Sequence, residues 1–292
     1  MSTSDKLIIN AAITGIVLSK KDTPFLPTTV DEIVECAVRV RQAGAAIVHI
    51  HARNCDDSPC YDPAVYCEIV GRVRAATDLV VCVSLSGRFV ADVGVRAAAL
   101  ASKPDLASLT LGSMNFMTQP SVNSPDTIRE LAERIYAAGA IPELEVFDAG
   151  FAHIINHLSR KGVLEAPHYV NILLGSLGTA PLDLVGLGHM VSLLPAGSIW
   201  SVAGLGRFQL DANVTAIAAG GHVRVGLEDN IYYDRGRREL TDNVRLVERI
   251  VRVAREMGRE PATPMEARRM IGLMNVRAAR ASLPRATEAV GV

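Results

Sequence analysis

The sequence has no excess of charge of either sign. Its 292 residues include 30 basic and 31 acidic side chains, for a formal net charge of -1. Binding to nucleic acids or to anionic membranes depends on a strongly basic surface. The balance of charge therefore argues against both kinds of partner, and we expect small-molecule ligands instead.

Cysteine pairs and a targeting segment are also missing. The cysteines form an odd set without a C-x-x-C pair: Cys36, Cys55, Cys60, Cys67 and Cys82. Such a set does not indicate a disulfide framework. The first residues, MSTSDKLIIN, lack the pattern of a secretory signal. We therefore expect the chain to work in the reducing cytoplasm.

The sequence lacks an uninterrupted membrane-length apolar run and an internal linker. The segment 184–206 carries no charge, but five glycines, Pro195 and His189 interrupt it. We predict a buried helix, a turn and a strand there. No Pro-rich, Ser-rich or charged linker divides the chain. At 49% hydrophobic residues, the length suffices for one large core, so we expect a single domain over residues 1–292.

What the sequence does contain is a series of short β-branched or apolar runs that alternate with longer helical patterns. The runs cover residues 6–15, 45–53, 79–87, 106–112, 141–148, 168–175, 199–206 and 222–229. This alternation is typical of βα units around a parallel sheet. Eight such units favour an α/β fold, a single (β/α)8 TIM barrel, over an open doubly wound sheet. A C-terminal helical extension is expected from about residue 263 to 292.

Two of the intervening segments have clear helix boundaries. Thr29 precedes the segment 30–44, with Glu32 at the capping-box position, and Ser124 precedes the segment 125–139, which begins with proline. Both segments end in a glycine, as expected just past a helix C-terminus. In a TIM barrel, catalytic side chains gather at the C-terminal ends of the strands, so residues there are the candidates for a site.

The end of the second predicted strand carries two histidines in the motif HIHAR. His49 and His51 share one face because side chains alternate along a strand. Glu228 ends the eighth strand, and two imidazoles plus one carboxylate are a usual ligand set of catalytic zinc. The alternative is that the histidines only line the barrel and bond to backbone or water. Their position facing an acidic strand end favours the metal site.

Strands five and eight supply further charged residues. Glu143 and Glu145 share one face in PELEVFD, and burying two carboxylates is costly unless they are paired, protonated or near a metal. Glu145 lies nearer the strand end and is the preferred candidate. Arg224 shares a face with Glu228 and precedes Asp229; an arginine beside a carboxylate suits a base that removes a proton. A structural ion pair is the alternative.

Weaker candidates surround these residues. Cys55 and Cys60 offer soft metal ligands, but their loop does not direct them inward, so a structural or surface role is favoured. Ser86 and Thr110 end strands three and four and are candidate hydrogen-bond donors to a substrate, although both types are common in turns. The glycines of the segment 204–207 follow strand seven, where barrels often bind phosphate. No G-x-S-x-G motif occurs, which argues against a serine hydrolase.

Longer motifs connect these residues with a known family. AAITG, AGAAIVHIHAR, ASLTLGSMNF, PELEVFDAG, IWSVAGLGR, GGHVRVGLEDN and PATPMEARRMIGL follow one another along nearly the whole chain. In these motifs the sequence resembles the β-keto acid cleavage enzymes, whose founding activity is 3-keto-5-aminohexanoate cleavage. The resemblance implies a zinc-dependent, homo-oligomeric barrel. Its reaction would condense a β-keto acid with acetyl-CoA and cleave the adduct to acetoacetate and a new acyl-CoA.

The same resemblance implies roles for individual residues. Zinc would be held by His49, His51 and Glu228. Asp229, oriented by Arg224, would remove a proton from the α-carbon of the keto acid.

The remaining implied roles concern the substrate. Glu145 would tune or relay protons, while Ser86 and Thr110 would hold the keto acid. Many family members have a Ser/Thr-Gly-Gly turn after strand three, where this chain reads SLSGRF, and the loop after HIHAR lacks the usual glycine. The first departure places Arg88 beside the pocket, where we expect it to meet a second carboxylate or other anionic group of the substrate.

Two other functions stay open on the sequence alone. A different zinc barrel, such as an aldolase or amidohydrolase, also uses strand-end histidines but would be expected to supply more of them. The other histidines fall in helix patterns or at strand starts: His153, His157, His168, His189 and His222. A non-catalytic barrel that binds a metabolite or CoA thioester is the second alternative. Such a barrel has no need of a base, yet Arg224, Glu228 and Asp229 are all present.

Overall fold

The computed structural model describes residues 6–117 and 119–274, and within them eight parallel strands close into a barrel in the order β10-β11-β2-β3-β4-β5-β8-β9. The predicted (β/α)8 barrel is thereby confirmed. The barrel strands are β2 (Ile9–Ala12), β3 (Ile47–Ile50), β4 (Val80–Val83), β5 (Leu106–Thr110), β8 (Ile141–Val146), β9 (Tyr169–Leu174), β10 (Ile199–Gly204) and β11 (His222–Val225).

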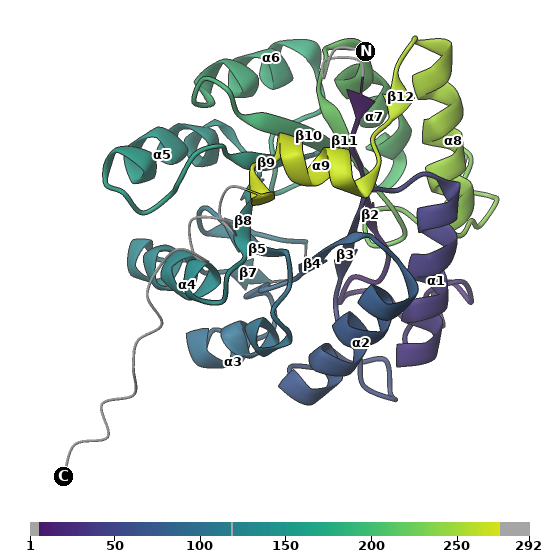
Figure 1. Ribbon diagram of the computed structural model, residues 1–292. Coiled ribbons are helices and arrows are strands. Elements are labelled where there is room, and N and C mark those ends of the chain that lie inside the picture. Colours follow the sequence, from purple (N-terminus) through teal and green to yellow (C-terminus); the bar gives the residue numbers. More distant parts are fainter. Residues whose placement is uncertain (1–5, 118, 275–292) are drawn as a thin grey trace.

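Each barrel strand is followed by a helix, and the helices form an outer ring (Figure 1). They are α1 (Val30–Ala43), α2 (Pro63–Ala76), α3 (Val93–Ala97), α4 (Pro125–Ala137), α5 (Ala149–Arg160), α6 (Leu184–Leu193), α7 (Gln209–Ala218) and α8 (Asn243–Glu256). Short 3-10 helices, η2 (Ala98–Ser102) and η3 (Gly206–Phe208), adjoin α3 and α7. A β-hairpin of β6 (Met114–Asn115) and β7 (Pro120–Ser121) follows β5.

The predicted helix boundaries are present where the sequence placed them. The Thr29 side chain accepts a hydrogen bond from the Glu32 N–H, and the Glu32 carboxylate accepts one from the Thr29 N–H, which completes the capping box of α1. Gly44 ends α1 with φ 119°, a conformation that favours glycine. The Ser124 side chain caps α4 by accepting a hydrogen bond from the Thr127 N–H. Local sequence is therefore sufficient to start and stop these helices.

The N-terminal end of the barrel is closed by the last described helix, α9 (Pro264–Met270). Ala267 of α9 and Ile271, which follows the helix, pack in one buried cluster with Ile8, Ile47 and Val80 at the N-terminal ends of the barrel strands. Figure 1 shows α9 lying across this end of the barrel. The strand pair β1 (Lys6–Leu7) and β12 (Glu260–Pro261) connects α9 to the barrel. The rest of the predicted extension, 275–292, lies outside the described residues.

The barrel strands are shorter at their C-terminal ends than the sequence indicated. The eighth strand was expected to reach residue 229 but ends at Val225. Gly226 follows with φ 156°, and a Cβ at this position would lie 2.1 Å from the Ala12 carbonyl oxygen. The chain therefore turns sharply here, so that Glu228 and Asp229 lie in a loop beyond the strand.

The segment 184–206 forms a helix, a turn and a strand, as predicted, but the helix buries only one face, with Leu187 and Met190. Leu184 and Val185 of α6 are 77% and 83% exposed, while β10 lies in the barrel wall. Within the part of the chain that the structure describes, no helix has the length and apolar character needed to cross a membrane.

Candidate active site

A cavity of about 320 Å³ lies at the C-terminal end of the barrel, opposite α9. Its wall includes Thr14 after β2, His51 after β3, Ser86 after β4, Glu145 at the end of β8 and Asp229 after β11. The volume is in the range of small-molecule sites. Closure of the barrel therefore brings the predicted site residues to one place, as expected for this fold.

Two histidines and one glutamate in this region have the arrangement of a metal site. The Nε2 atoms of His49 and His51 lie 3.8 Å and 3.2 Å from the nearest carboxylate oxygens of Glu228. His49 Nε2 and Glu228 Oε2 are buried and have no hydrogen-bond partner among the described residues. Leaving two buried polar atoms unpaired is costly. Two nitrogen donors and one oxygen donor are a set that suits zinc.

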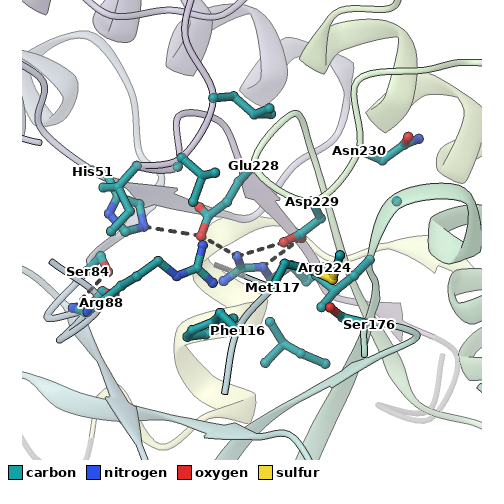
Figure 2. Close-up of a pocket in the computed structure, with 18 of the residues that line it drawn as sticks. His51, Ser84, Arg88, Phe116, Met117, Ser176, Arg224, Glu228, Asp229 and Asn230 are labelled. Atoms are coloured by element: carbon teal, nitrogen blue, oxygen red, sulfur yellow. Dashed lines mark hydrogen bonds and ion pairs between the residues drawn. The ribbon is translucent and has the colours of Figure 1, made fainter. Parts of the chain in front are cut away.

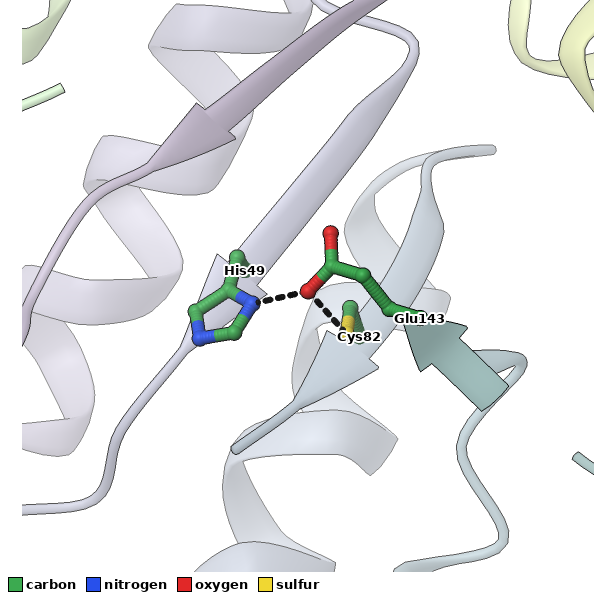
Figure 3. Close-up of side chains that lie close together, drawn as sticks. All are labelled: His49, Cys82 and Glu143. Atoms are coloured by element: carbon green, nitrogen blue, oxygen red, sulfur yellow. Dashed lines mark hydrogen bonds and ion pairs between the residues drawn. The ribbon is translucent and has the colours of Figure 1, made fainter. Parts of the chain in front are cut away.

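The other ring nitrogen of His49 contacts an inner carboxylate. His49 Nδ1 lies 2.8 Å from Glu143 Oε2, and Cys82 Sγ lies 3.4 Å from the same oxygen (Figure 3). Asn10 Nδ2 donates to Glu143 Oε1 at 2.5 Å. Glu143 is fully buried and does not line the cavity, so it reaches the site only through His49.

His49, Cys82 and Glu143 are also close enough together to form a second candidate metal group. Burial, with Glu143 beside it, raises the pKa of the Cys82 thiol well above its ordinary value. A metal-binding cysteine is a thiolate, so this inner group is the poorer ligand set. In the outer group of His49, His51 and Glu228, the last two residues line the cavity.

Arg224 is the electrostatic centre of the cavity wall (Figure 2). Its Nε and Nη2 atoms donate to the two carboxylate oxygens of Asp229 at 2.9 Å and 3.1 Å. Nη2 also lies 2.7 Å from Glu228 Oε1, and Nη1 lies 3.9 Å from Glu145 Oε1. Burial raises the pKa of Asp229, although Arg224 opposes this shift. Asp229 is therefore a carboxylate held in one orientation with increased proton affinity.

The predicted substrate-binding hydroxyls differ in what they can still donate. Thr110 lines the cavity, and its Oγ1 donates its hydrogen to Glu145 Oε2 at 2.6 Å, so it can still accept a hydrogen bond. Ser86 Oγ accepts from the Arg88 N–H at 3.3 Å and lines the cavity. Burial raises the pKa of Glu145, against the effect of Arg224. Ser86 is thus the better placed of the two predicted donors.

The glycine segment after β10 does not present the expected phosphate site. The Leu205 N–H donates to the Leu174 carbonyl oxygen at 2.8 Å, and the Gly206 N–H donates to the Asp229 carbonyl oxygen at 2.7 Å. Both N–H groups are therefore occupied within the protein, and the Gly206 bond joins this segment to the Asp229 loop. The predicted use of the glycines of the segment 204–207 as backbone donors to phosphate is therefore wrong for Gly206, whose N–H is occupied.

Sequence comparison identifies the family to which this arrangement belongs. The model of the family described as beta-keto acid cleavage enzyme matches residues 6–273. The chain belongs to the beta-keto acid cleavage enzyme family. It is 37% identical to the 3-keto-5-aminohexanoate cleavage enzyme of Fusobacterium nucleatum subsp. nucleatum, over 92% of this chain and 98% of that protein. It is 34% identical to the 3-oxoadipate:acetyl-CoA acetyltransferase of Cupriavidus necator, over 91% and 94%.

Solved structures share the fold of this family member. The ternary complex of ObcA with C4-CoA adduct and oxalate has a TM-score of 0.76 and 21% sequence identity, and covers 85% of this chain and 68% of that chain. The apo structure of ObcA has a TM-score of 0.75 at the same identity, with 85% and 66% covered. At this level of identity the similarity shows the barrel fold.

The remaining histidines and cysteines of this β-keto acid cleavage enzyme lie away from the cavity, as predicted. His153 and His157 are in α5, His189 is in α6, His168 precedes β9 and His222 begins β11. Cys55 is exposed and Cys60 is buried, and neither lines the cavity. No further histidine therefore joins the site from the described residues, in contrast to the expectation for the aldolase or amidohydrolase alternative.

Three residues that contact Glu143 or line the cavity were not predicted from the sequence. Asn10 and Cys82 contact Glu143 inside the barrel, and Phe116 lines the cavity from the β6–β7 hairpin. A single polar residue within an otherwise apolar barrel strand was the available signal for Asn10 and Cys82. No local pattern indicated Phe116, because its position depends on where the hairpin folds.

Proposed function

We propose that this family member is a zinc-dependent acyltransferase that acts on a β-keto acid and acetyl-CoA and releases acetoacetate and a new acyl-CoA. The observation that carries the proposal is a fixed carboxylate, Asp229, in the wall of a cavity that is also lined by His51 and Glu228 of the two-histidine, one-glutamate group. Relatives named for keto acid cleavage and for acetyl-CoA acetyl transfer support the same reaction. The chain acts as a single catalytic domain.

The metal would be held by His49, His51 and Glu228. When bound there, zinc polarises the ketone oxygen and lowers the cost of the enolate. Glu143 holds His49 through Nδ1, so that Nε2 is directed at the ligand position. Arg224 holds Glu228 from the other side at 2.7 Å. The protein's part is thus to fix the ligand atoms before the substrate arrives.

Asp229 takes the proton from the α-carbon of the keto acid, and the electron pair of that C–H bond moves into the enolate. Arg224 keeps both oxygens of Asp229 oriented through two hydrogen bonds. Its positive charge stabilises the ionised carboxylate and so limits the rise in the proton affinity of Asp229. Buried carboxylates with raised proton affinity are effective bases in this role. Glu145, which contacts Thr110, relays protons within the cavity.

The α-carbon then attacks the thioester carbonyl carbon of acetyl-CoA, a C–C bond forms, and the C–S bond breaks to release the CoA thiolate. The thiolate adds to the original ketone carbon of the adduct. The bond between that carbon and the α-carbon breaks, which yields the new acyl-CoA and the acetoacetate carbanion. Asp229 returns its proton to the carbanion. Ser86 donates a hydrogen bond to the bound keto acid during these steps.

The enzyme acts on these small molecules in the cytoplasm, and we propose that it does so as a homo-oligomer. The near neutrality of the chain, with a net charge of -1, supports small-molecule substrates rather than nucleic acid or membrane partners.

The test combines metal content with turnover. The purified protein is analysed for zinc and then incubated with acetyl-CoA and a panel of β-keto acids while acetoacetate is measured. About one zinc per chain, with acetoacetate formed from one substrate class, is the expected result. Zinc without acetoacetate from any acid would reject the proposed reaction and favour aldolase or amidohydrolase chemistry. Absence of both would favour a metabolite-binding barrel.

A further inference from the structure

Arg88 is a charged side chain of the cavity wall whose charge Glu228, Glu145 and Asp229 balance only from beyond ion-pair distance. Arg224 contacts Asp229 and Glu228, whereas no carboxylate among the described residues forms an ion pair with Arg88. Its Nε atom is buried and has no hydrogen-bond acceptor. Arg237 also lines the cavity, but it is exposed, so that water satisfies its donors. A buried N–H group without an acceptor is costly, and a ligand that supplies an anion beside Arg88 removes this cost.

Arg88 is also held in one position before any ligand binds. Its backbone N–H donates to Ser86 Oγ, and its carbonyl oxygen accepts from Gln119 Nε2. The guanidinium carbon lies 3.4 Å from the centroid of the Phe116 ring, and Figure 2 shows both side chains in the cavity, with Arg88 reaching toward Glu228. Stacking uses the face of the guanidinium and leaves its N–H donors free in the plane. The side chain therefore offers a preformed fork.

We propose that Arg88 binds the second carboxylate of a dicarboxylic β-keto acid, and that such acids are the preferred substrates. This inference rests on the proposed function. A carboxylate has two coplanar oxygens that match the arginine fork. The carboxylate present in every β-keto acid is one carbon from the ketone, so it stays with the reacting carbons beside Asp229. Arg224 pairs with both Asp229 and Glu228, whereas Arg88 has no carboxylate within ion-pair distance among the described residues, which leaves it as the cation for an additional anion.

The decisive comparison uses two six-carbon acids that differ only at the far end, 3-oxoadipate with a carboxylate and 3-oxohexanoate with a methyl group. Wild type should have the higher kcat/KM for 3-oxoadipate at saturating acetyl-CoA. Arg88→Met, which keeps a long side chain over Phe116, should lose about 10- to 100-fold on 3-oxoadipate and less than about threefold on 3-oxohexanoate. Arg88→Lys, with charge but no fork, should fall between the two.

Other outcomes would overturn the assignment. Equal losses on both acids would place Arg88 at the carboxylate common to all β-keto acids. A raised KM for acetyl-CoA alone would place it at a CoA phosphate. Arg129→Ala serves as the matched control, because Arg129 is an exposed arginine of α4 that pairs with Asp126. It should leave unchanged the kcat/KM values for both acids and the KM for acetyl-CoA.

A binding measurement separates this inference from the proposed reaction. Glutarate and pentanoate are unreactive five-carbon probes with and without the second carboxylate, and their affinities are measured calorimetrically on the zinc-loaded protein. Glutarate should bind more tightly than pentanoate, and Arg88→Met should remove that advantage. If no acid yields acetoacetate but the tighter binding of glutarate still depends on Arg88, the proposed reaction is rejected and the carboxylate site is supported. If the advantage survives in Arg88→Met, the inference fails.

Discussion

The Nδ1 atom of His49 lies 2.8 Å from Oε2 of Glu143, in the closed interior of the barrel just below the cavity. The contact determines which ring nitrogen faces the cavity, because Nδ1 is occupied and Nε2 is left without a partner. A carboxylate behind a histidine ligand commonly fixes its tautomer and increases its basicity. Glu143 is therefore a positioning residue, whereas Glu145, two residues along the same strand, lines the cavity itself.

Replacing Glu143 should weaken metal binding without removing a metal ligand. Glu143→Gln keeps the shape of the side chain but loses the charge that orients His49, so zinc affinity should fall by about 10- to 100-fold. Competition with a chromophoric chelator measures the affinity directly. Wild-type affinity in this variant would contradict the positioning role.

Two further variants distinguish the outer and inner candidate metal groups. His51→Ala removes a ligand of the outer group and should abolish stoichiometric zinc binding. Cys82→Ser alters only the inner group of His49, Cys82 and Glu143 and should retain about one zinc per chain. The reverse pattern, with zinc lost from Cys82→Ser and kept in His51→Ala, would place the metal inside the barrel.

The role of Asp229 as base predicts a partial reaction that needs no acetyl-CoA. Wild type should exchange the α-protons of a bound keto acid with D2O, and NMR follows this exchange directly. Asp229→Asn keeps the shape but cannot accept the proton, so exchange and turnover should both fall by about 100- to 10,000-fold. Unchanged enzyme-dependent exchange in this variant, above the rate without enzyme, would assign the base to another residue.

Gly226 is expected to be indispensable for the turn that carries Glu228 and Asp229. Gly226→Ala places a Cβ 2.1 Å from the Ala12 carbonyl oxygen at a φ of 156°, so it should lower the free energy of unfolding by about 1–3 kcal/mol and reduce turnover. Urea denaturation measures the loss. Gly188→Ala in α6, where nothing lies within 4 Å of the added atom, should be neutral or stabilising by up to about 1 kcal/mol. Similar effects of the two substitutions would contradict this account.

Acid should destabilise the protein through His222. Burial, with Arg259 adding to it, lowers the pKa of His222 in the folded state from 6.5 to about 3, and Nδ1 accepts from the Ile8 N–H. The folded state therefore resists protonation that the unfolded state accepts. The His222 contribution is complete above pH 6.5 and is lost by about 1.4 kcal/mol per pH unit as the pH falls toward 3.

Urea denaturation of the zinc-free protein between pH 7 and pH 4.5 measures this dependence. His222→Leu should be less stable than wild type at pH 7, because the buried Ile8 N–H loses its acceptor, but its stability should fall less steeply with acid. Parallel curves for the two proteins would assign the acid sensitivity to other groups.

Sequence by itself was sufficient for the order of elements and for most of the residues that meet in the cavity. Strand periodicity placed His49 and His51 on one face, and capping residues placed the starts of α1 and α4. A TIM barrel brings the C-terminal ends of its strands together at one rim. Once the strands were counted, the residues that lie at this rim could therefore be predicted. The phosphate site at Gly206 and the burial of α6 were the exceptions.

Only the tertiary structure decided the depth and the partners of the individual side chains. Periodicity assigns a residue to a face but gives neither its height along the barrel axis nor its neighbour from a distant strand. Glu143 and Glu145 are equivalent by pattern, yet one contacts His49 from below the cavity and the other accepts from Thr110 within it. These contacts join residues 94 and 35 positions apart, and they depend on the register and closure of the barrel, which no local stretch of sequence contains.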